Sequence, residues 1–114
     1  MADPALCSPA WRLRGIGYDP GALTLADDRL SFRTEEGMVF DVPLAEVSKV
    51  VAPWYYFGGG LKLSVGDERY RFSFVAPNGA PPVSRSLLPP GAVGRPWVFA
   101  GRDAGREWRE ALGV

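Results

Sequence analysis

Short runs in which apolar and polar side chains alternate constrain the fold of this chain more than any other feature. Successive side chains on a strand point to opposite faces, so such a run has one apolar and one polar face. This pattern is typical of antiparallel sheets that pack on one side. The apolar members of the runs are Leu23 and Leu25; Leu30 and Phe32; Met38, Phe40 and Val42; Leu61, Leu63 and Val65; and Tyr70, Phe72 and Phe74.

The breaks between the runs have the composition of tight turns. Glycine supplies positive φ angles there, and aspartate tolerates them. Two further segments, Trp11–Ile16 and Val47–Ala52, are predicted strands; Val47–Ala52 is almost continuously apolar, which indicates a strand buried on both sides or at a sheet corner. Together these segments predict a mainly β fold, a meander of about seven antiparallel strands closing into a barrel or sandwich. The predicted turns are Asp19-Pro20-Gly21, Asp27-Asp28, Glu35-Glu36-Gly37 and Gly66-Asp67.

The period changes near the end of the chain, where the spacing predicts a helix over about residues 102–112. Its apolar stripe has the i, i+4, i+7, i+8 spacing of one helix face. Asp103 is a plausible N-cap, and Gly113 follows the last turn as a C-terminal stop would. The members of the stripe are Ala104, Trp108, Ala111 and Leu112.

The remaining segments give the domain organisation. Residues 1–10 are predicted to be a flexible N-terminus, followed by a single domain over 11–114, a length that suits one hydrophobic core. Residues 76–96 contain six prolines, which suit neither sheet nor helix interiors, so a loop that is either mobile or functional is expected there. Trp97–Phe99 then returns to apolar character, which indicates a short added strand or a clamp before the helix.

Composition excludes several classes of function. The chain has 13 basic and 13 acidic residues, no histidine and one cysteine, Cys7. Neutral charge argues against a nucleic-acid binder, and the residue inventory excludes a Cys/His zinc site, a Ser-His-Asp triad and an intramolecular disulfide. No signal peptide and no apolar stretch of membrane-spanning length is present, so a cytoplasmic protein without metal or cofactor is expected.

The order of these segments resembles the pleckstrin-homology-like barrel, most closely its bacterial and GRAM-type members. About seven strands followed by one amphipathic helix with a central tryptophan, here Trp108, is the plan of that family. The resemblance implies a binding scaffold, used for phosphoinositides, peptides or other protein surfaces, rather than an enzyme. The segments that carry it are Gly21–Phe32, Asp41–Val47, Gly60–Leu63, Tyr70–Phe74 and Glu107–Leu112.

Phosphoinositide-binding members of that family carry a lysine and an Arg-x-Arg pair around the first hairpin. In this chain Arg12 and Arg14 share a face of the first predicted strand, but Asp19 occupies the following loop and no lysine is near. The chain departs from the family's pattern at this point, which argues against inositol-lipid recognition.

Two sets of residues are candidate binding residues. Trp54, Tyr55, Tyr56 and Phe57 run directly into three glycines, and four adjacent rings cannot all enter one core. Either one pair enters the core and the others cover the sheet or the proline-rich loop, or the rings form an exposed interaction surface.

Arg69 and Arg71 are the second set, and both point away from the apolar face of their strand. If the strands are neighbours, these arginines form a basic face with Arg29 and Arg33. Such a face is either paired with acids such as Glu68 and Asp41 or a site for an anion or a lipid headgroup.

Two functional hypotheses follow. The first is a non-catalytic interaction domain that binds a protein or peptide through an exposed edge strand or the aromatic residues Trp54–Phe57. The alternative is peripheral binding to a membrane surface or to anionic lipid headgroups. No constellation of residues indicates an enzyme, and the sequence leaves the oligomeric state open.

Overall fold

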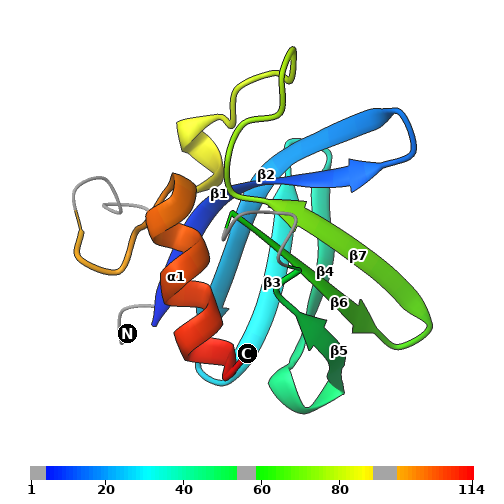
Figure 1. Ribbon diagram of the computed structural model, residues 1–114, viewed down its shortest axis with the longest axis vertical. Coiled ribbons are helices and arrows are strands. Elements are labelled where there is room, and N and C mark those ends of the chain that lie inside the picture. Colours follow the sequence, from blue (N-terminus) through cyan, green and yellow to red (C-terminus); the bar gives the residue numbers. More distant parts are fainter. Residues whose placement is uncertain (1–4, 54–58, 89–94) are drawn as a thin grey trace.

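The structure is a computed structural model that describes residues 5–53, 59–88 and 95–114. Within these ranges the chain forms seven strands and one α-helix, which confirms the predicted fold class (Figure 1). Two short 3-10 turns, η1 (Leu44–Glu46) and η3 (Arg85–Leu87), lie between them. The elements are β1 (Leu6–Arg14), β2 (Gly17–Ala26), β3 (Arg29–Thr34), β4 (Gly37–Pro43), β5 (Val47–Val51), β6 (Gly60–Val65), β7 (Glu68–Ser73) and α1 (Gly101–Leu112).

The strands form one sheet in the order β4-β3-β2-β1-β7-β6-β5, and every neighbouring pair is antiparallel. β4 and β5 are the two edges of this sheet, yet they follow one another in the chain and only the η1 turn separates them. The sheet must therefore curl until its edges approach each other, and it forms a half-barrel (Figure 1).

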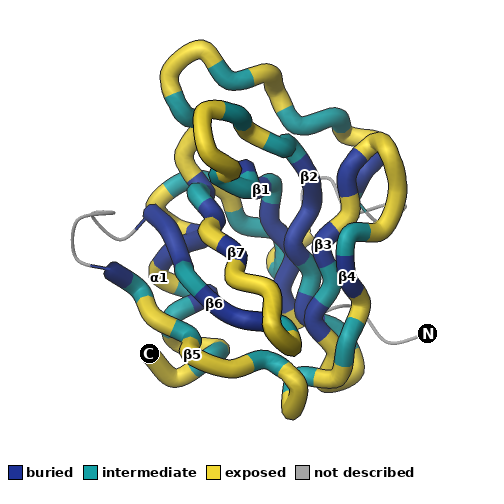
Figure 2. Tube along the Cα trace, turned by 90° about the vertical axis from the view of Figure 1, so that its right-hand side faces the viewer, coloured by how far each residue is buried: buried dark blue, intermediate teal, exposed yellow. Residues whose placement is uncertain are grey.

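The concave side of the sheet holds the core. The alternation predicted from the sequence is visible along the strands, where buried and exposed residues follow one another (Figure 2). Phe32 packs edge-on against Phe72, with ring centroids 4.8 Å apart, and Phe40 packs against Tyr70 at 4.9 Å. Such aromatic pairs contribute beyond the area they bury.

Helix α1 covers the open end of the half-barrel, and Trp108 is its central contact. The indole is fully buried, stacks on Phe74 with centroids 6.0 Å apart, and donates a hydrogen bond from Nε1 to Ser8 Oγ at 2.9 Å. Gly113 ends the helix in the left-handed conformation (φ 73°), as predicted.

Two details of the predicted helix are wrong. The N-cap is Ala100, and Asp103 lies inside the first turn, where its charge still suits the helix dipole. Ala111 is exposed, whereas Ala104, Gly105 and Trp108 are buried and Leu112 packs partly against the core.

The prediction of a flexible N-terminus through residue 10 is also wrong, because β1 begins at Leu6. The C-terminal segment fixes this part of the strand: Cys7 N donates to Trp97 O at 2.9 Å, and Phe99 N donates to Cys7 O at 3.0 Å. Trp97–Phe99 thus adds alongside β1 through a parallel bridge between Cys7 and Val98, which confirms the expected added strand or clamp.

The turn predicted at Asp19-Pro20-Gly21 does not exist, since these residues lie inside β2, and the chain turns instead at Gly15 (φ 52°) and Ile16. β3 reaches only as far as Gly21, so Pro20 sits where β2 has no partner on that side and its missing N–H leaves no hydrogen bond unmade. Gly21 is needed for packing, because a Cβ there would lie 2.7 Å from the Phe32 ring.

The described part of the proline-rich segment, residues 76–88, is tied to the convex side of β1 and β3. Trp11 Nε1 donates to Pro81 O at 2.8 Å, and the Arg33 guanidinium donates to Ser86 O and Leu87 O at 3.1 Å each. Leu87 is buried beneath this strap. The expectation that some of the rings of Trp54–Phe57 cover this loop concerns residues outside the described ranges.

Candidate functional site

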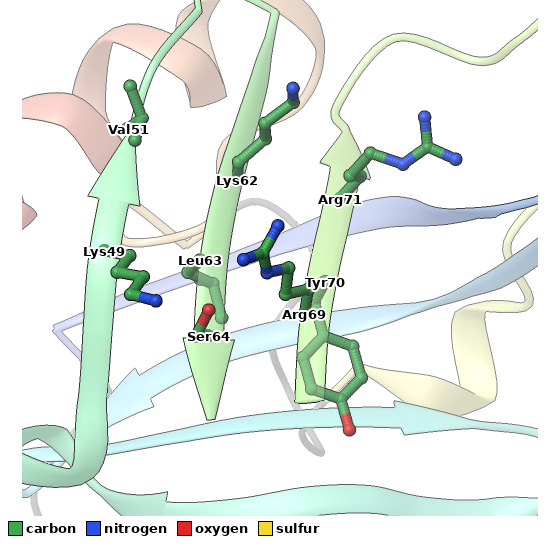
Figure 3. A pocket seen from close by; sticks show the side chains of 8 residues that line it. All are labelled: Lys49, Val51, Lys62, Leu63, Ser64, Arg69, Tyr70 and Arg71. Atoms are coloured by element: carbon green, nitrogen blue, oxygen red, sulfur yellow. The ribbon is translucent and has the colours of Figure 1, made fainter. Parts of the chain in front are cut away.

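A hollow of about 400 Å³ lies on the convex side of the sheet, across β5, β6 and β7 (Figure 3). We call it the basic groove, because four of its lining residues carry a positive charge. None of the described residues that line it is acidic. Its lining residues are Lys49, Val51, Lys62, Leu63, Ser64, Arg69, Tyr70 and Arg71.

The β6–β7 hairpin supplies three of these cations by simple alternation, Lys62 from β6 and Arg69 and Arg71 from β7. Leu61, Leu63, Tyr70 and Phe72 are buried in the core, so the residues between them face outward. The register then sets Lys62 opposite Arg71 and Ser64 opposite Arg69. Gly66, which begins the connecting turn, has the positive φ (58°) expected of the first residue of a type II′ turn.

A β-bulge in β5 brings the fourth cation to the groove. Ser48 pairs with Ser64 and Val51 with Lys62, so β5 advances three residues where β6 advances two. Lys49 lies in this bulge with a left-handed backbone (φ 52°), which is uncommon for a residue other than glycine, asparagine or aspartate.

The same bulge corrects the prediction for Val47–Ala52. β5 is an edge strand, and Ser48, Lys49 and Val51 are exposed rather than buried on both sides. Only part of the apolar run is buried: Val47 and Val50 pack against the core, whereas Val51 is half exposed.

Three cations of the basic groove have no partner among the described residues. No described residue forms an ion pair or a hydrogen bond with the side chain of Lys49, Arg69 or Arg71. Like charges directly opposite on neighbouring strands, such as Lys62 and Arg71, repel each other and weaken a sheet. This arrangement therefore lowers the stability of the free protein and attracts anions.

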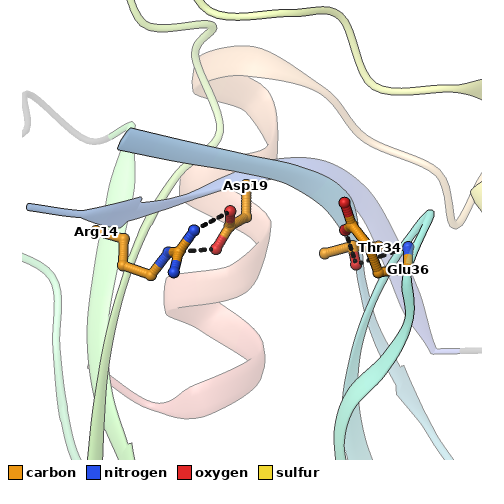
Figure 4. Close-up of polar contacts among 4 residues, drawn as sticks. All are labelled: Arg14, Asp19, Thr34 and Glu36. Atoms are coloured by element: carbon orange, nitrogen blue, oxygen red, sulfur yellow. Dashed lines mark hydrogen bonds and ion pairs between the residues drawn. The ribbon is translucent and has the colours of Figure 1, made fainter. Parts of the chain in front are cut away.

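Several other arginines of the chain have partners within the fold. Figure 4 shows Arg14 in a two-point contact with Asp19, whose shortest N–O distance is 2.9 Å. In the same figure Thr34 is engaged by Glu36, with Oγ1 3.0 Å from Oε2. Arg12 stacks over the Tyr70 ring, 4.4 Å from its centroid, on the concave side. These groups are built into the fold, unlike those of the basic groove.

The expected basic face of Arg69 and Arg71 with Arg29 and Arg33 is wrong in its membership. β3 is not a neighbour of β7, so the second pair lies elsewhere. Arg29 forms an ion pair with Asp41 at 3.1 Å, which confirms the expected pairing with that acid, and Arg33 binds the strap. Arg69 and Arg71 instead meet Lys49 and Lys62, the only two lysines of the chain.

The sequence contained a signal for Lys62 but not for Lys49. Lys62 alternates with Leu61 and Leu63, so its outward direction follows from the pattern, whereas the bulge that places Lys49 has no sequence signature. The other candidate residues, Trp54, Tyr55, Tyr56 and Phe57, lie outside the described residues, and the hypothesis of an aromatic surface stays a prediction.

The single cysteine of the chain is not activated as a nucleophile. Burial raises the pKa of the Cys7 thiol above its ordinary value of 9.0, outweighing the hydrogen bond with Thr24 and the positive charge of Arg33. The thiol is therefore protonated and a poor nucleophile near neutral pH. Across residues 5–53, 59–88 and 95–114 no three potential metal ligands gather, and no helix there is long and apolar enough to cross a membrane.

Comparisons with known proteins assign no family. No protein-family model matches the chain, and neither a curated protein nor a solved structure gives a significant match. The basic groove therefore has to be interpreted from its own chemistry.

Proposed function

We propose that this protein is a non-catalytic interaction domain that binds an acidic protein or peptide segment in the basic groove. One observation carries the proposal: four cations from three adjacent strands line one hollow without a described carboxylate among them, in a chain whose total charge is zero. Positive charge gathered in this way provides affinity and orientation for a ligand of opposite sign.

The sheet order, the single capping helix and the absence of histidine support a binding domain rather than an enzyme. The same plan supports the resemblance to the pleckstrin-homology-like family, whose members are mostly binding scaffolds. Membership of that family remains part of this proposal.

The edge of β5 is a weaker candidate for the ligand than the groove. Proteins protect an exposed edge strand with bulges and lysines, which disturb the hydrogen-bonding row that an added strand needs. β5 has both at Lys49. We therefore assign recognition to the side chains of the groove rather than to main-chain pairing along this edge.

A chain segment fits the groove better than a bilayer does. The groove is concave, whereas a membrane surface is nearly flat and is bound by basic and apolar side chains that project together. Among the described lining residues, Val51 is the one exposed aliphatic side chain.

The test is titration of the protein into a fluorescein-labelled ten-residue peptide of alternating glutamate and glycine, followed by anisotropy. A matched lysine–glycine peptide serves as the control ligand. We expect the acidic peptide alone to bind, and its affinity to fall steeply between about 0.01 M and about 1 M salt, as the Debye length shrinks from ~30 to ~3 Å.

Two variants localise the binding. Arg69→Glu with Arg71→Glu should abolish it, while Arg102→Glu, at an exposed position of α1 outside the groove, should not change it. Equal binding of both peptides, or equal effects of the groove and helix variants, would contradict the proposal. Binding confined to vesicles of anionic lipid would replace it with the membrane alternative.

A further inference from the structure

The cations of the basic groove are not evenly spread, and two of them converge on a hydroxyl group. In Figure 3 Lys49 reaches from β5 and Arg69 from β7 toward the middle strand, where Ser64 lies between them. The register explains the convergence: Ser64 is the direct partner of Ser48 on one side and of Arg69 on the other. Lys49 follows Ser48 in the bulge of β5, and its side chain reaches back toward the same row, which is roughly 10 Å wide at the usual strand spacing.

Ser64 is unusual among the outward-facing residues of these strands. The residue is only 7% exposed, it lines the groove, and its hydroxyl forms no hydrogen bond with any described residue. The hydroxyl opens into the groove and can donate to a group bound there. It therefore lies within the part of the groove on which the two cations converge.

We infer that the row of Lys49, Ser64 and Arg69 binds a phosphate monoester carried by the acidic segment. This inference rests on the proposed function and names the group that the groove reads. A carboxylate has one negative charge and two oxygens, whereas a phosphate monoester has up to two charges and three free oxygens. A phosphate therefore offers more charge and more acceptor oxygens than a carboxylate to an ammonium, a guanidinium and a hydroxyl that converge on one point.

Arginine and lysine then have separate roles. The planar guanidinium of Arg69 can grip two phosphate oxygens side by side, while the ammonium of Lys49 acts as a point charge on the third. Lys62 and Arg71, at the other end of the groove, face the acidic residues that flank the phosphate. The site thus separates a phosphate row from a row that binds carboxylates.

The composition of the chain makes this inference testable by pH. A phosphate monoester dianion takes up one proton and becomes a monoanion near pH 6, whereas glutamate keeps its charge until pH falls close to about 4.3. The protein has no histidine, so none of its side chains has an ordinary pKa between about pH 5.5 and about pH 7.5. A loss of affinity over this range that affects only a phosphorylated peptide must come from the phosphate.

The experiment compares two peptides that differ at one position. Both are the alternating glutamate–glycine peptide with its central residue replaced, in one by phosphoserine and in the other by glutamate, measured by anisotropy with the full chain. We expect the phosphorylated peptide to bind about tenfold more tightly at pH near 7.5, as one extra charge-assisted hydrogen bond would give. Most of this advantage should disappear at pH near 5.5.

Variants separate the two rows. Ser64→Ala and Arg69→Lys should each remove most of the phosphate advantage while changing the affinity for the glutamate peptide little. Arg71→Gln should weaken both peptides in proportion, and Arg102→Gln should affect neither. Arg69 is exposed, so Arg69→Lys does not endanger folding even if Ser64→Ala does.

Three outcomes would overturn the inference. Equal affinity for the two peptides, or a phosphate advantage that survives both Ser64→Ala and Arg69→Lys, would remove the phosphate site but leave an acidic-segment binder. Failure of both peptides to bind would remove the proposed function as well. Tighter binding to vesicles that contain phosphatidylserine than to the phosphopeptide would assign the row to a lipid headgroup.

Discussion

Two substitutions of Lys49 should stabilise the protein. This residue combines a left-handed backbone conformation with a charge that neighbouring cations repel. Its φ of 52° lies in the left-handed region, which costs an ordinary residue roughly 1–2 kcal/mol. Asparagine adopts this conformation more readily, since its short polar side chain hydrogen-bonds locally. Lys49→Asn should therefore recover about 1 kcal/mol of that cost.

Loss of the charge adds a smaller gain. A cation about 7 Å away repels Lys49 by ~0.6 kcal/mol in water before screening, and physiological salt reduces this by more than half. With two or three such neighbours the gain is about 0.5 kcal/mol. We therefore expect Lys49→Asn to raise the free energy of unfolding by about 1.5 kcal/mol, and Lys49→Gln, which removes only the charge, by about 0.5 kcal/mol.

The assay is urea unfolding followed by fluorescence of the four tryptophans, with a constant m value as the condition for comparing midpoints. Lys62 gives a matched control, because it stands on a regular strand of the same groove. There Lys62→Asn should be less stable than Lys62→Gln, since asparagine is a poor strand residue. Equal stabilities of Lys49→Asn and Lys49→Gln would refute the reasoning, and so would the same order of Asn and Gln at both positions.

Three further predictions concern the core. Trp108→Phe removes the hydrogen bond to Ser8 and part of the packing, so it should lower the free energy of unfolding by about 1–3 kcal/mol. Ser8→Ala should lower this free energy less in the Trp108→Phe background than in the native chain, which a double-mutant cycle would measure. Gly21→Ala should cost about 1–3 kcal/mol in a denaturant titration, because its Cβ would meet the Phe32 ring. Since burial raises the pKa of Cys7, the folded state holds this proton more tightly than the unfolded state does. Its contribution to stability should thus be constant below pH 9.0 and fall as pH rises through the folded-state pKa, a loss that Cys7→Ser should remove in pH-dependent melts.

The strands were predictable where one face of the sheet meets solvent, because only there does the side-chain pattern alternate. Leu30 and Phe32 in β3 and Tyr70 and Phe72 in β7 follow this rule and appear in the core as expected. The start of β1 does not follow this rule, because Trp97–Phe99, which is remote in the sequence, pairs with it. No local pattern contains that information.

The turn predicted at Asp19-Pro20-Gly21 is wrong for a physical reason. Pro20 and Gly21 have the composition of a turn, but both lie within β2. Pro20 is tolerated because β3 ends before it and needs no hydrogen bond from its nitrogen, and Gly21 is needed because the Phe32 ring leaves no room for a side chain. Gly66 and the Asp27-Asp28 pair, with φ values of 58°, 52° and 58°, are real turns. Local composition therefore shows what a turn needs, but the tertiary partners decide whether the chain turns.

The candidate site was half predictable by the same logic. Arg69 and Arg71 are outward because their strand alternates, but their companions depend on strand order. The expected companions Arg29 and Arg33 belong to a strand on the far side of β1 and β2. Lys49 joins the groove only through the bulge in an edge strand.

The position of the groove follows from how the rest of the convex face is used. The strap packs on β1 and β3 through Trp11 and Arg33, and Trp97–Phe99 lies alongside β1. The cations of the basic groove gather instead on β5, β6 and β7, where they include a strained lysine and two like charges directly opposite each other. Packing explains neither feature, and both lower the stability of the free protein. An anion in the groove would reverse the second cost by neutralising the repulsion, and would raise the stability of the fold in proportion to its affinity. A groove that is costly when empty and stabilised when occupied is what a binding site requires, and this is why we assign the function of the domain to it.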